Sequence, residues 1–384
     1  MTNTYRRSLG LIELVSLGVG GTIGSGIFVV PGIAAGILGP SSLIAWVFVG
    51  LSATFVMLSL IWLSGEFGNT ESFFTIFSRV FGERIAAALI VLYLIGGIFG
   101  IGTIAAGIGQ YLTFFGIGGV LVAEVIILAF FCTLNLAGIA LSGMSENILT
   151  LLKVIPLVVI AILLLPFIKI ENLAPIVPFS AAGLLSTILI VYWPFTGFEI
   201  SAIPVNEVKD PGLIPRSLVM VMVIVLGIYL LLNISLIGSV GSAVLSASPT
   251  PVATAVAIVF SHSGAIVAVI GIIAMLSALN AYIIGGSRVM HSAALSQKVP
   301  FLSSLNFRGT PTVPLLLLCS LSAGVLFFSN SFERLAVLSV LTTLIPYLFF
   351  CVGAFIVNSN FYRRLVAFAG IVSSFAILLL TFLI

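Results

Sequence analysis

The chain alternates between long apolar stretches and short segments that are rich in charge, glycine or proline. A helix needs about 20 apolar residues to cross the hydrocarbon core of a bilayer. Stretches of that length recur from end to end, which predicts an all-α integral membrane protein with about eleven spans. We expect the spans at 9–38, 41–63, 84–115, 119–140, 147–169, 182–205, 216–240, 264–292, 312–329, 334–357 and 364–384.

Composition supports this interpretation and leaves little room for anything outside the membrane. Hydrophobic residues make up 61% of the 384 residues and charged residues 7%, whereas soluble domains carry about 25% charged residues. We therefore expect a single transmembrane domain over 1–384. The net charge of +3 gives no reason to expect a nucleic-acid partner. Cys132, Cys319 and Cys351 lie in apolar runs without metal or disulfide spacing, so neither a metal nor a cofactor is expected.

The basic residues predict the orientation, because cytoplasmic loops carry an excess of Lys and Arg. With the N-terminus in the cytoplasm, only Lys169 and Arg334 of the 14 basic residues fall in outer loops, and Lys153 falls within a span. The sequence thus predicts a multi-pass protein of the cytoplasmic cell membrane with a cytoplasmic N-terminus. The inner loops then hold Arg6, Arg7, Arg79, Arg84, Lys209, Arg216, Arg288, Lys298, Arg308, Arg363 and Arg364.

Two connecting segments are long enough to form structure of their own. Segment 64–83 mixes charges with Phe and is expected along the cytoplasmic surface. Segment 241–263 is rich in Ser, Pro and Ala, and we expect it outside as a short helix pair that acts as a lid.

Glycines crowd the middle of the first span. Gly20, Gly21, Gly24 and Gly26 lie there, with Pro31 close behind. Each Gly costs roughly 1 kcal/mol against Ala inside a helix, so this cluster predicts a broken helix at membrane depth. Such backbone is tolerated only where it is buried in protein or lines a cavity. The alternative is close helix packing, since Gly20 and Gly24 have small-xxx-small spacing.

The sixth span is also interrupted, by Trp193-Pro-Phe-Thr-Gly197. The first and sixth spans are five spans apart, so they cross the membrane in opposite directions. Interrupted helices at corresponding places in two halves indicate a midplane site between inverted repeats. We expect repeats at about 9–170 and 180–358, with an extra helix at 364–384, and this pairing favours a transport site over packing alone.

The ends of a broken helix can bind both charged groups of a zwitterion. The second half-helix starts near Ser25 and Gly26, where free N–H groups suit a carboxylate. Carbonyls near Thr22 and in the Phe195–Gly197 break suit an ammonium group, so the expected ligand is an amino acid. Its side chain would face Trp193, Phe195 and the glycines of span three, although glycines also serve close packing. The predicted binding residues are Thr22, Ile23, Gly24, Ser25, Gly26, Gly96, Gly97, Trp193, Phe195 and Thr196, with Gly100 beside them.

Ionisable residues within a span are costly and are functional candidates by default. Glu199 follows the sixth-span break, and we take it as the only intramembrane carboxylate. It either caps unwound backbone or contacts substrate. Lys153 either extends its ammonium to the interface or points inward to the open carbonyls of the first span, where it could exchange a proton.

Four patches together resemble the amino acid–polyamine–organocation (APC) superfamily. They are Gly18-Val-Gly-Gly-Thr-Ile-Gly-Ser-Gly-Ile-Phe28, Phe195-Thr-Gly-Phe-Glu199, the loop Asn206–Pro211 with Ile214-Pro-Arg216, and Ser287-Arg-Val-Met290 with Val299-Pro300.

The resemblance implies a LeuT-type five-plus-five inverted repeat with discontinuous first and sixth helices, and an amino-acid permease that works by alternating access. Ser25 and Gly26 match carboxylate contacts, and the carbonyls of Thr22 and Thr196 match contacts to the amino group. Trp193 matches a gating aromatic residue. Lys153 matches a lysine that replaces a sodium ion, which implies sodium-independent proton symport or exchange.

Other functions remain open at this stage. The same fold could carry polyamines, other organic cations or nucleobases. A cationic substrate would want a pocket carboxylate, which favours a neutral amino acid here. An integral membrane transferase would need several polar catalytic groups on one face, yet His262 and His291 are expected on opposite sides, so we do not expect an enzyme. The sequence leaves monomer and homodimer open.

Overall fold

The transmembrane spans are present as expected. The computed structural model describes residues 7–174 and 181–381. Eight apolar helical runs there are long enough to cross a membrane, and the first, Leu11–Glu66, contains two predicted spans. Two shorter apolar helices, Val120–Leu136 and Thr312–Phe328, account for the fourth and ninth spans. The prediction of an all-α membrane protein with about eleven spans is therefore confirmed.

Apolar helices that run between the two ends of the bundle make up most of the fold. In chain order they are α1 Leu11–Thr22, α2 Ser25–Leu38, α3 Ser42–Glu66, α5 Glu83–Thr113, α6 Val120–Leu136, α7 Ile139–Leu164, α8 Ala181–Tyr192, α9 Leu213–Val240, α12 Gly264–Ser296, α13 Thr312–Phe328, α14 Phe332–Val357 and α15 Phe361–Thr381. The shorter ones are α4 Phe73–Phe81, α10 Ser242–Ser246 and α11 Pro251–Val259, with 3₁₀ turns η1 Gly39–Ser41, η2 Leu165–Phe167, η3 Ile170–Leu173, η4 Trp193–Phe195, η5 Phe198–Ala202 and η6 Val205–Glu207.

The first span is broken between α1 and α2. Ile23 leaves the helical region with φ −83° and ψ 89°, and Gly24 follows at φ −136° and ψ −136°. Pro31 lies inside α2 and does not end it. The break therefore follows from the glycines, whereas Pro31 plays no part in it.

The sixth span is broken as well, but its second half is not an α-helix. α8 tightens into η4, Thr196 is extended, and Gly197 adopts a left-handed φ of +99° before η5 begins. Pro194 removes a backbone donor at this point, which favours leaving the helix.

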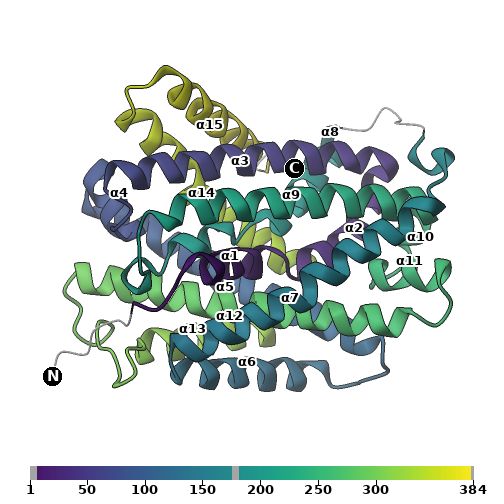
Figure 1. The fold of residues 1–384 in the computed structure, drawn as a ribbon, viewed down its shortest axis with the longest axis horizontal. Coiled ribbons are helices and arrows are strands. Elements are labelled where there is room, and N and C mark those ends of the chain that lie inside the picture. The colour runs from purple at the N-terminus through teal and green to yellow at the C-terminus, as the bar shows by residue number, and fades with distance from the viewer. Residues whose placement is uncertain (1–6, 175–180, 382–384) are drawn as a thin grey trace.

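The two short-helix segments lie at opposite ends of the bundle. Figure 1 shows α4 at one end and the pair α10 and α11 at the other, so the expected helix pair in 241–263 is present. The interrupted helix α1 runs through the middle and packs against α7, α9 and α12. α15 lies at the edge, against α3 and α14.

Backbone bonds join the segment before α1 to the loop after the sixth span. The N–H groups of Ser8 and Leu9 donate to the carbonyl of Glu207, and Lys209 N–H donates to Leu9 O. The Glu207 side chain is buried and accepts from Arg288 of α12 at 3.0 Å. Burial raises the pKa of the Glu207 carboxyl, and the nearby Arg288 guanidinium opposes that rise.

Gly197 is the position where an added methyl group should damage the fold most clearly. Its φ is left-handed, and a Cβ would lie 2.7 Å from the carbonyl oxygen of Gly21. Gly116 has a similar φ of +73° with open space around it. Gly116→Ala should cost about 1–2 kcal/mol, the left-handed penalty alone, and Gly197→Ala distinctly more. Thermal unfolding in detergent measures both, and equal losses would contradict the close approach of the two breaks.

Candidate functional site

The two helix breaks meet at a small central cavity. Its volume is about 10 Å³, and it lies where α1, α2, η4, α5 and α12 converge. No charged side chain lines it, and it is too small to hold an amino acid, so the site is closed in this conformation. The lining residues are Gly21, Thr22, Gly24, Ser25, Gly26, Ile104, Trp193, Ala278 and Tyr282.

Glycine lets the surrounding elements approach the first break closely. A Cβ on Gly24 would lie 2.5 Å from the Ala278 methyl group, and a Cβ on Gly26 would lie 2.7 Å from the Pro194 Cα. No side chain caps the start of α2. Its first N–H groups therefore border the cavity without a side-chain partner, which is the geometry that binds carboxylates at helix N-termini.

The carbonyl side of the break is partly engaged already. Tyr229 of α9 donates its hydroxyl to Thr22 O at 2.7 Å and lies 2.9 Å from Pro194 O. One tyrosine thus ties the first break to the sixth. The carbonyl of Gly21 faces Gly197 across the contact described above.

Trp193 lines the cavity, and both Trp193 and Thr196 contact α12. The Trp193 indole N–H donates to Ser25 Oγ at 3.3 Å, and its ring lies 5.9 Å from that of Tyr282. The Thr196 hydroxyl is 3.0 Å from the Tyr282 hydroxyl. Phe195 points away from the cavity, because its ring packs against Trp46 of α3 and Tyr229 of α9.

The glycines of α5 divide between packing and lining. Gly96 accepts from Ser339 at 2.7 Å, and a Cβ there would run into Thr343, so Gly96 serves contact with α14. Gly97 lines a second cavity of about 20 Å³ beside Glu199. Gly100 lies against the Tyr282 ring.

Glu199 caps the sixth-span break and holds two neighbouring helices to it. Its carboxylate accepts from Gly197 N–H at 3.0 Å, from Tyr93 of α5 at 2.8 Å and from Tyr347 of α14 at 2.5 Å. This geometry corresponds to the capping interpretation, because Glu199 is not among the residues that line the central cavity.

Lys153 is fully buried, and its ammonium points to the first break. It donates to Gly20 O at 2.9 Å, to Ile23 O at 2.7 Å and to Ser277 Oγ of α12 at 2.7 Å. The carbonyls that lose their helical hydrogen bonds where α1 ends are thereby bonded by a side chain of α7.

Glu199 is not the only carboxylate within the spans, and that expectation was wrong. Glu146 of α7 is fully buried, and it accepts from Ser277, Asn280 and Thr150. Glu124 of α6 is also buried, 3.4 Å from Asn330 Nδ2. Both carboxylates lie at the edges of apolar runs, and that position in the sequence is the signal that could have identified them.

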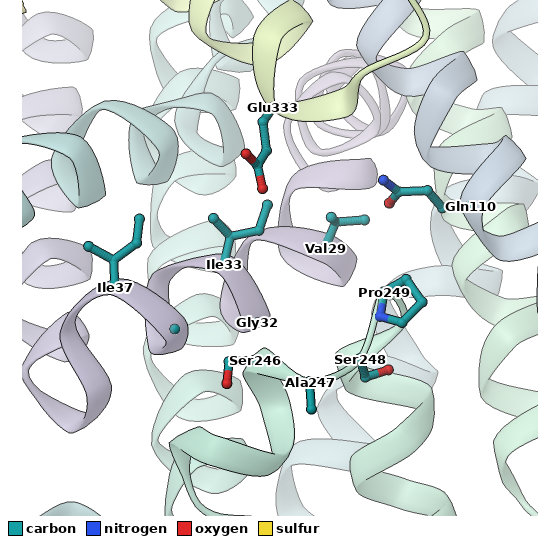
Figure 2. Close-up of a pocket in the computed structure, with 11 residues that line it drawn as sticks. Val29, Gly32, Ile33, Ile37, Gln110, Ser246, Ala247, Ser248, Pro249 and Glu333 are labelled. Carbon is teal, nitrogen blue, oxygen red and sulfur yellow. The ribbon is translucent and has the colours of Figure 1, made fainter.

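A larger cavity of about 480 Å³ lies beyond the central one, toward α10 and α11. It is bounded by α2, the end of α5, the turn after α10 and the start of α14, and Figure 2 shows Glu333 and Gln110 directed into it. It shares no lining residue with the central cavity, so the two are separate in this conformation.

No metal site emerges in the part of the chain that the structure describes, where no three His, Cys, Asp or Glu side chains cluster suitably. The two histidines lie toward opposite ends of α12, His262 before its start and His291 near its end.

Comparison with known proteins gives one consistent result. Residues 9–384 match the model of a family described as amino acid permease. The chain is 27% identical to the inner membrane transport protein YbaT of Escherichia coli over 78% of this chain and 72% of that protein. It is 24% identical to the serine/threonine exchanger SteT of Bacillus subtilis over 93% and 85%, respectively. It is 24% identical to the branched-chain amino acid permease BcaP of the same species over 77% and 69%.

The family match and the two discontinuous spans together confirm the LeuT-type fold class and the APC resemblance. Since the match covers nearly the whole described chain, it does not depend on one motif. The chain belongs to the amino acid permease family and is a multi-pass membrane transporter.

Proposed function

We propose that this protein carries neutral amino acids across the cytoplasmic membrane by alternating access, independently of sodium, through proton coupling or exchange. One observation supports this most directly. Residues of both helix breaks line one central cavity, which includes the start of α2 and has no charged lining residue. Such a site suits a zwitterion whose side chain carries no charge.

Sodium independence rests on the position of Lys153. A sodium ion bound at the first break would need oxygen ligands, and the carbonyls of Gly20 and Ile23 there accept hydrogen bonds from the Lys153 ammonium instead. The Lys153 ammonium thus takes the place of a bound cation.

Alternating access requires each side to open in turn. On the outer side, the 480 Å³ cavity offers an approach that reaches Val29, about one helical turn along α2 from Ser25. On the inner side, Glu199 with its two tyrosines and Glu207 with Arg288 hold the bundle together. We assign α4 and the N-terminus to the cytoplasmic side, and the lid α10–α11 to the outside, in line with the distribution of basic residues.

Polyamines and other organic cations fit less well. Such a substrate needs an anionic partner in the pocket, and none lines the central cavity. Glu199, the carboxylate that follows the sixth-span break, already accepts three hydrogen bonds.

A thermal-shift screen of the purified protein tests the substrate class. It would compare the twenty amino acids, several polyamines and nucleobases, each with and without sodium. A ligand at 100 times its Kd stabilises the native state by about 2.7 kcal/mol. We expect a subset of neutral amino acids to raise the melting temperature equally with and without sodium, and uptake into proteoliposomes to follow the same ranking. Stabilisation by polyamines or nucleobases alone would contradict the assignment.

Analogues of the best ligand test the two poles of the site separately. The decarboxylated amine should lose stabilisation because the N–H groups of Ser25 and Gly26 need an anion. The N-acetyl derivative should lose it because the carbonyls need an ammonium group. Competition by either analogue at the concentration of the parent amino acid would show that the corresponding pole is misassigned.

Tyr347→Phe tests the inner closure. The substitution removes a hydrogen bond to a carboxylate, which is worth about 1.5–3 kcal/mol. We expect a lower melting temperature and faster reaction of cysteines introduced along the inner half of α5, because the inner side opens more often. Tyr362→Phe, at a residue 76% exposed, is the control. Unchanged labelling in Tyr347→Phe would rule out an inner closure at Glu199.

A further inference from the structure

A second charged side chain lies beside Lys153 and is unexplained by substrate binding. Glu146 belongs to the same helix, α7, and both side chains are completely buried. Neither residue lines the central cavity. Seven residues separate them along α7, so they lie two turns or about 10 Å apart along the helix axis.

A single hydroxyl group connects the two. The Lys153 ammonium has three N–H donors, and Gly20 O, Ile23 O and Ser277 Oγ accept them. Ser277 in turn donates its own hydrogen to Glu146 Oε1. Both hydrogen bonds have the same donor-to-acceptor direction, from the ammonium to the hydroxyl and from the hydroxyl to the carboxylate. A proton can therefore pass from Lys153 to Glu146 without movement of heavy atoms.

Polar groups on the other side of Glu146 hold it in place. Asn280 Nδ2 donates to Glu146 Oε2 at 2.9 Å, and Asn135 Nδ2 of α6 donates to Asn280 Oδ1 at 2.9 Å. Thr150 Oγ1 lies 3.3 Å from Glu146 Oε1 and 3.2 Å from Ser16 O of α1. Gly20 leaves room for the carboxylate, since a Cβ there would overlap it.

Other ionisable groups on the packed helices have partners elsewhere or lie at the helix ends. On α12, Tyr282 contacts Thr196, Arg288 pairs with Glu207, and His291 contacts Ser303 O. On α9, Tyr229 bonds to Thr22 O, and Arg216 lies in the first turn. α1 carries Glu13 in its first turn. α6 carries Glu124 near its start and Cys132 beside Cys319. Glu146 and Lys153 are therefore linked to each other through Ser277, the hydrogen-bond partner that they share.

The hydrogen-bond chain from Lys153 through Ser277 to Glu146 leads toward one end of the bundle. α7 begins at the end of the bundle that holds α4, so Glu146 lies nearer that end than Lys153 does. Under the orientation proposed above, this end faces the cytoplasm. Glu146 is thus one step along a route from the middle of the protein to the cytoplasmic side.

We propose that Glu146 is the cytoplasmic-side proton acceptor for Lys153, with Ser277 as the relay between them; this rests on the proposed transport function. In the transfer, Lys153 gives one proton to Ser277 Oγ while Ser277 gives its hydroxyl proton to Glu146 Oε1. The charged pair becomes a neutral amine and a neutral carboxylic acid, and Ser277 is restored. Glu146 then releases the proton to the cytoplasm.

Movement of α1 drives the transfer. Two of the three acceptors of Lys153 are carbonyls of the first span, Gly20 O and Ile23 O. When α1 tilts to open the inner side, these carbonyls leave, and the charged ammonium loses most of its stabilisation in a buried site. Ser277 belongs to α12 and remains as the exit for the proton. Opening of the inner side and proton release are therefore one event.

The test uses purified full-length protein in proteoliposomes with internal pyranine, at zero membrane potential. External addition of an equimolar mixture of the twenty L-amino acids should acidify the lumen of vesicles that contain the unaltered protein. In Glu146→Gln, proton entry per amino acid should fall by about tenfold, a change of about 1.4 kcal/mol, because the amide cannot take up the proton. Counterflow of the same mixture, which needs no net proton release, reports whether the variant still binds and transports.

Ser277→Ala provides the second variant, because it removes the relay and keeps both charges. If Glu146→Gln fails to fold, Ser277→Ala alone tests the proposed proton route. Ser217→Ala is the matched control, since Ser217 is buried and donates only within its own helix, to Ile214 O. Undiminished proton entry in Glu146→Gln or Ser277→Ala would overturn the proposed route. Amino acid flux without acidification in the unaltered protein would also overturn it while leaving transport intact. Absence of any flux would instead contradict the proposed function.

Discussion

The break in the first span can exist inside a membrane because Lys153 donates hydrogen bonds to carbonyl groups that the break leaves without helical partners. Lipid offers no hydrogen bonds, so each carbonyl released by unwinding would cost several kcal/mol if it were left alone. Lys153 binds two of these carbonyls, and Tyr229 binds a third. The side chains come from α7 and α9, which lie on either side of α1. The position of both helices, and with it the shape of the central cavity, depends on these bonds.

In the proposed site, backbone N–H and carbonyl groups make the polar contacts to the ligand. The surrounding side chains therefore determine the shape of the cavity and how it is closed. Gly24 and Gly26 admit their neighbours closely, and Trp193 covers the cavity while bonding to Ser25. This division is what the proposed function requires, since the proposed zwitterionic ligand would enter a cavity that no charged residue lines.

The sequence is informative about what depends on local composition. Span positions follow from apolar length, the first break from glycines, and the helix pair in 241–263 from Ser, Pro and Ala. Facing directions could not be predicted in the same way. Gly96 and Gly97 are neighbours in sequence, yet successive helical residues point about 100° apart, so one packs on α14 and the other borders Glu199. The place of Glu146 at the edge of an apolar run marks it as a candidate, but its partners on α12 lie more than a hundred residues away and could not be predicted.

The backbone hydrogen bonds at Glu207 link the two interrupted spans mechanically. The segment before α1 and the loop after the sixth span are joined by an isolated parallel β-bridge between Leu9 and Val208, and Arg288 of α12 is tied to the same loop through Glu207. The segment that precedes the first span and the loop that follows the sixth span are consequently held to each other. Because these contacts join the segment before α1 to η6 and, through Glu207, to α12, a displacement of α1 would be transmitted to both.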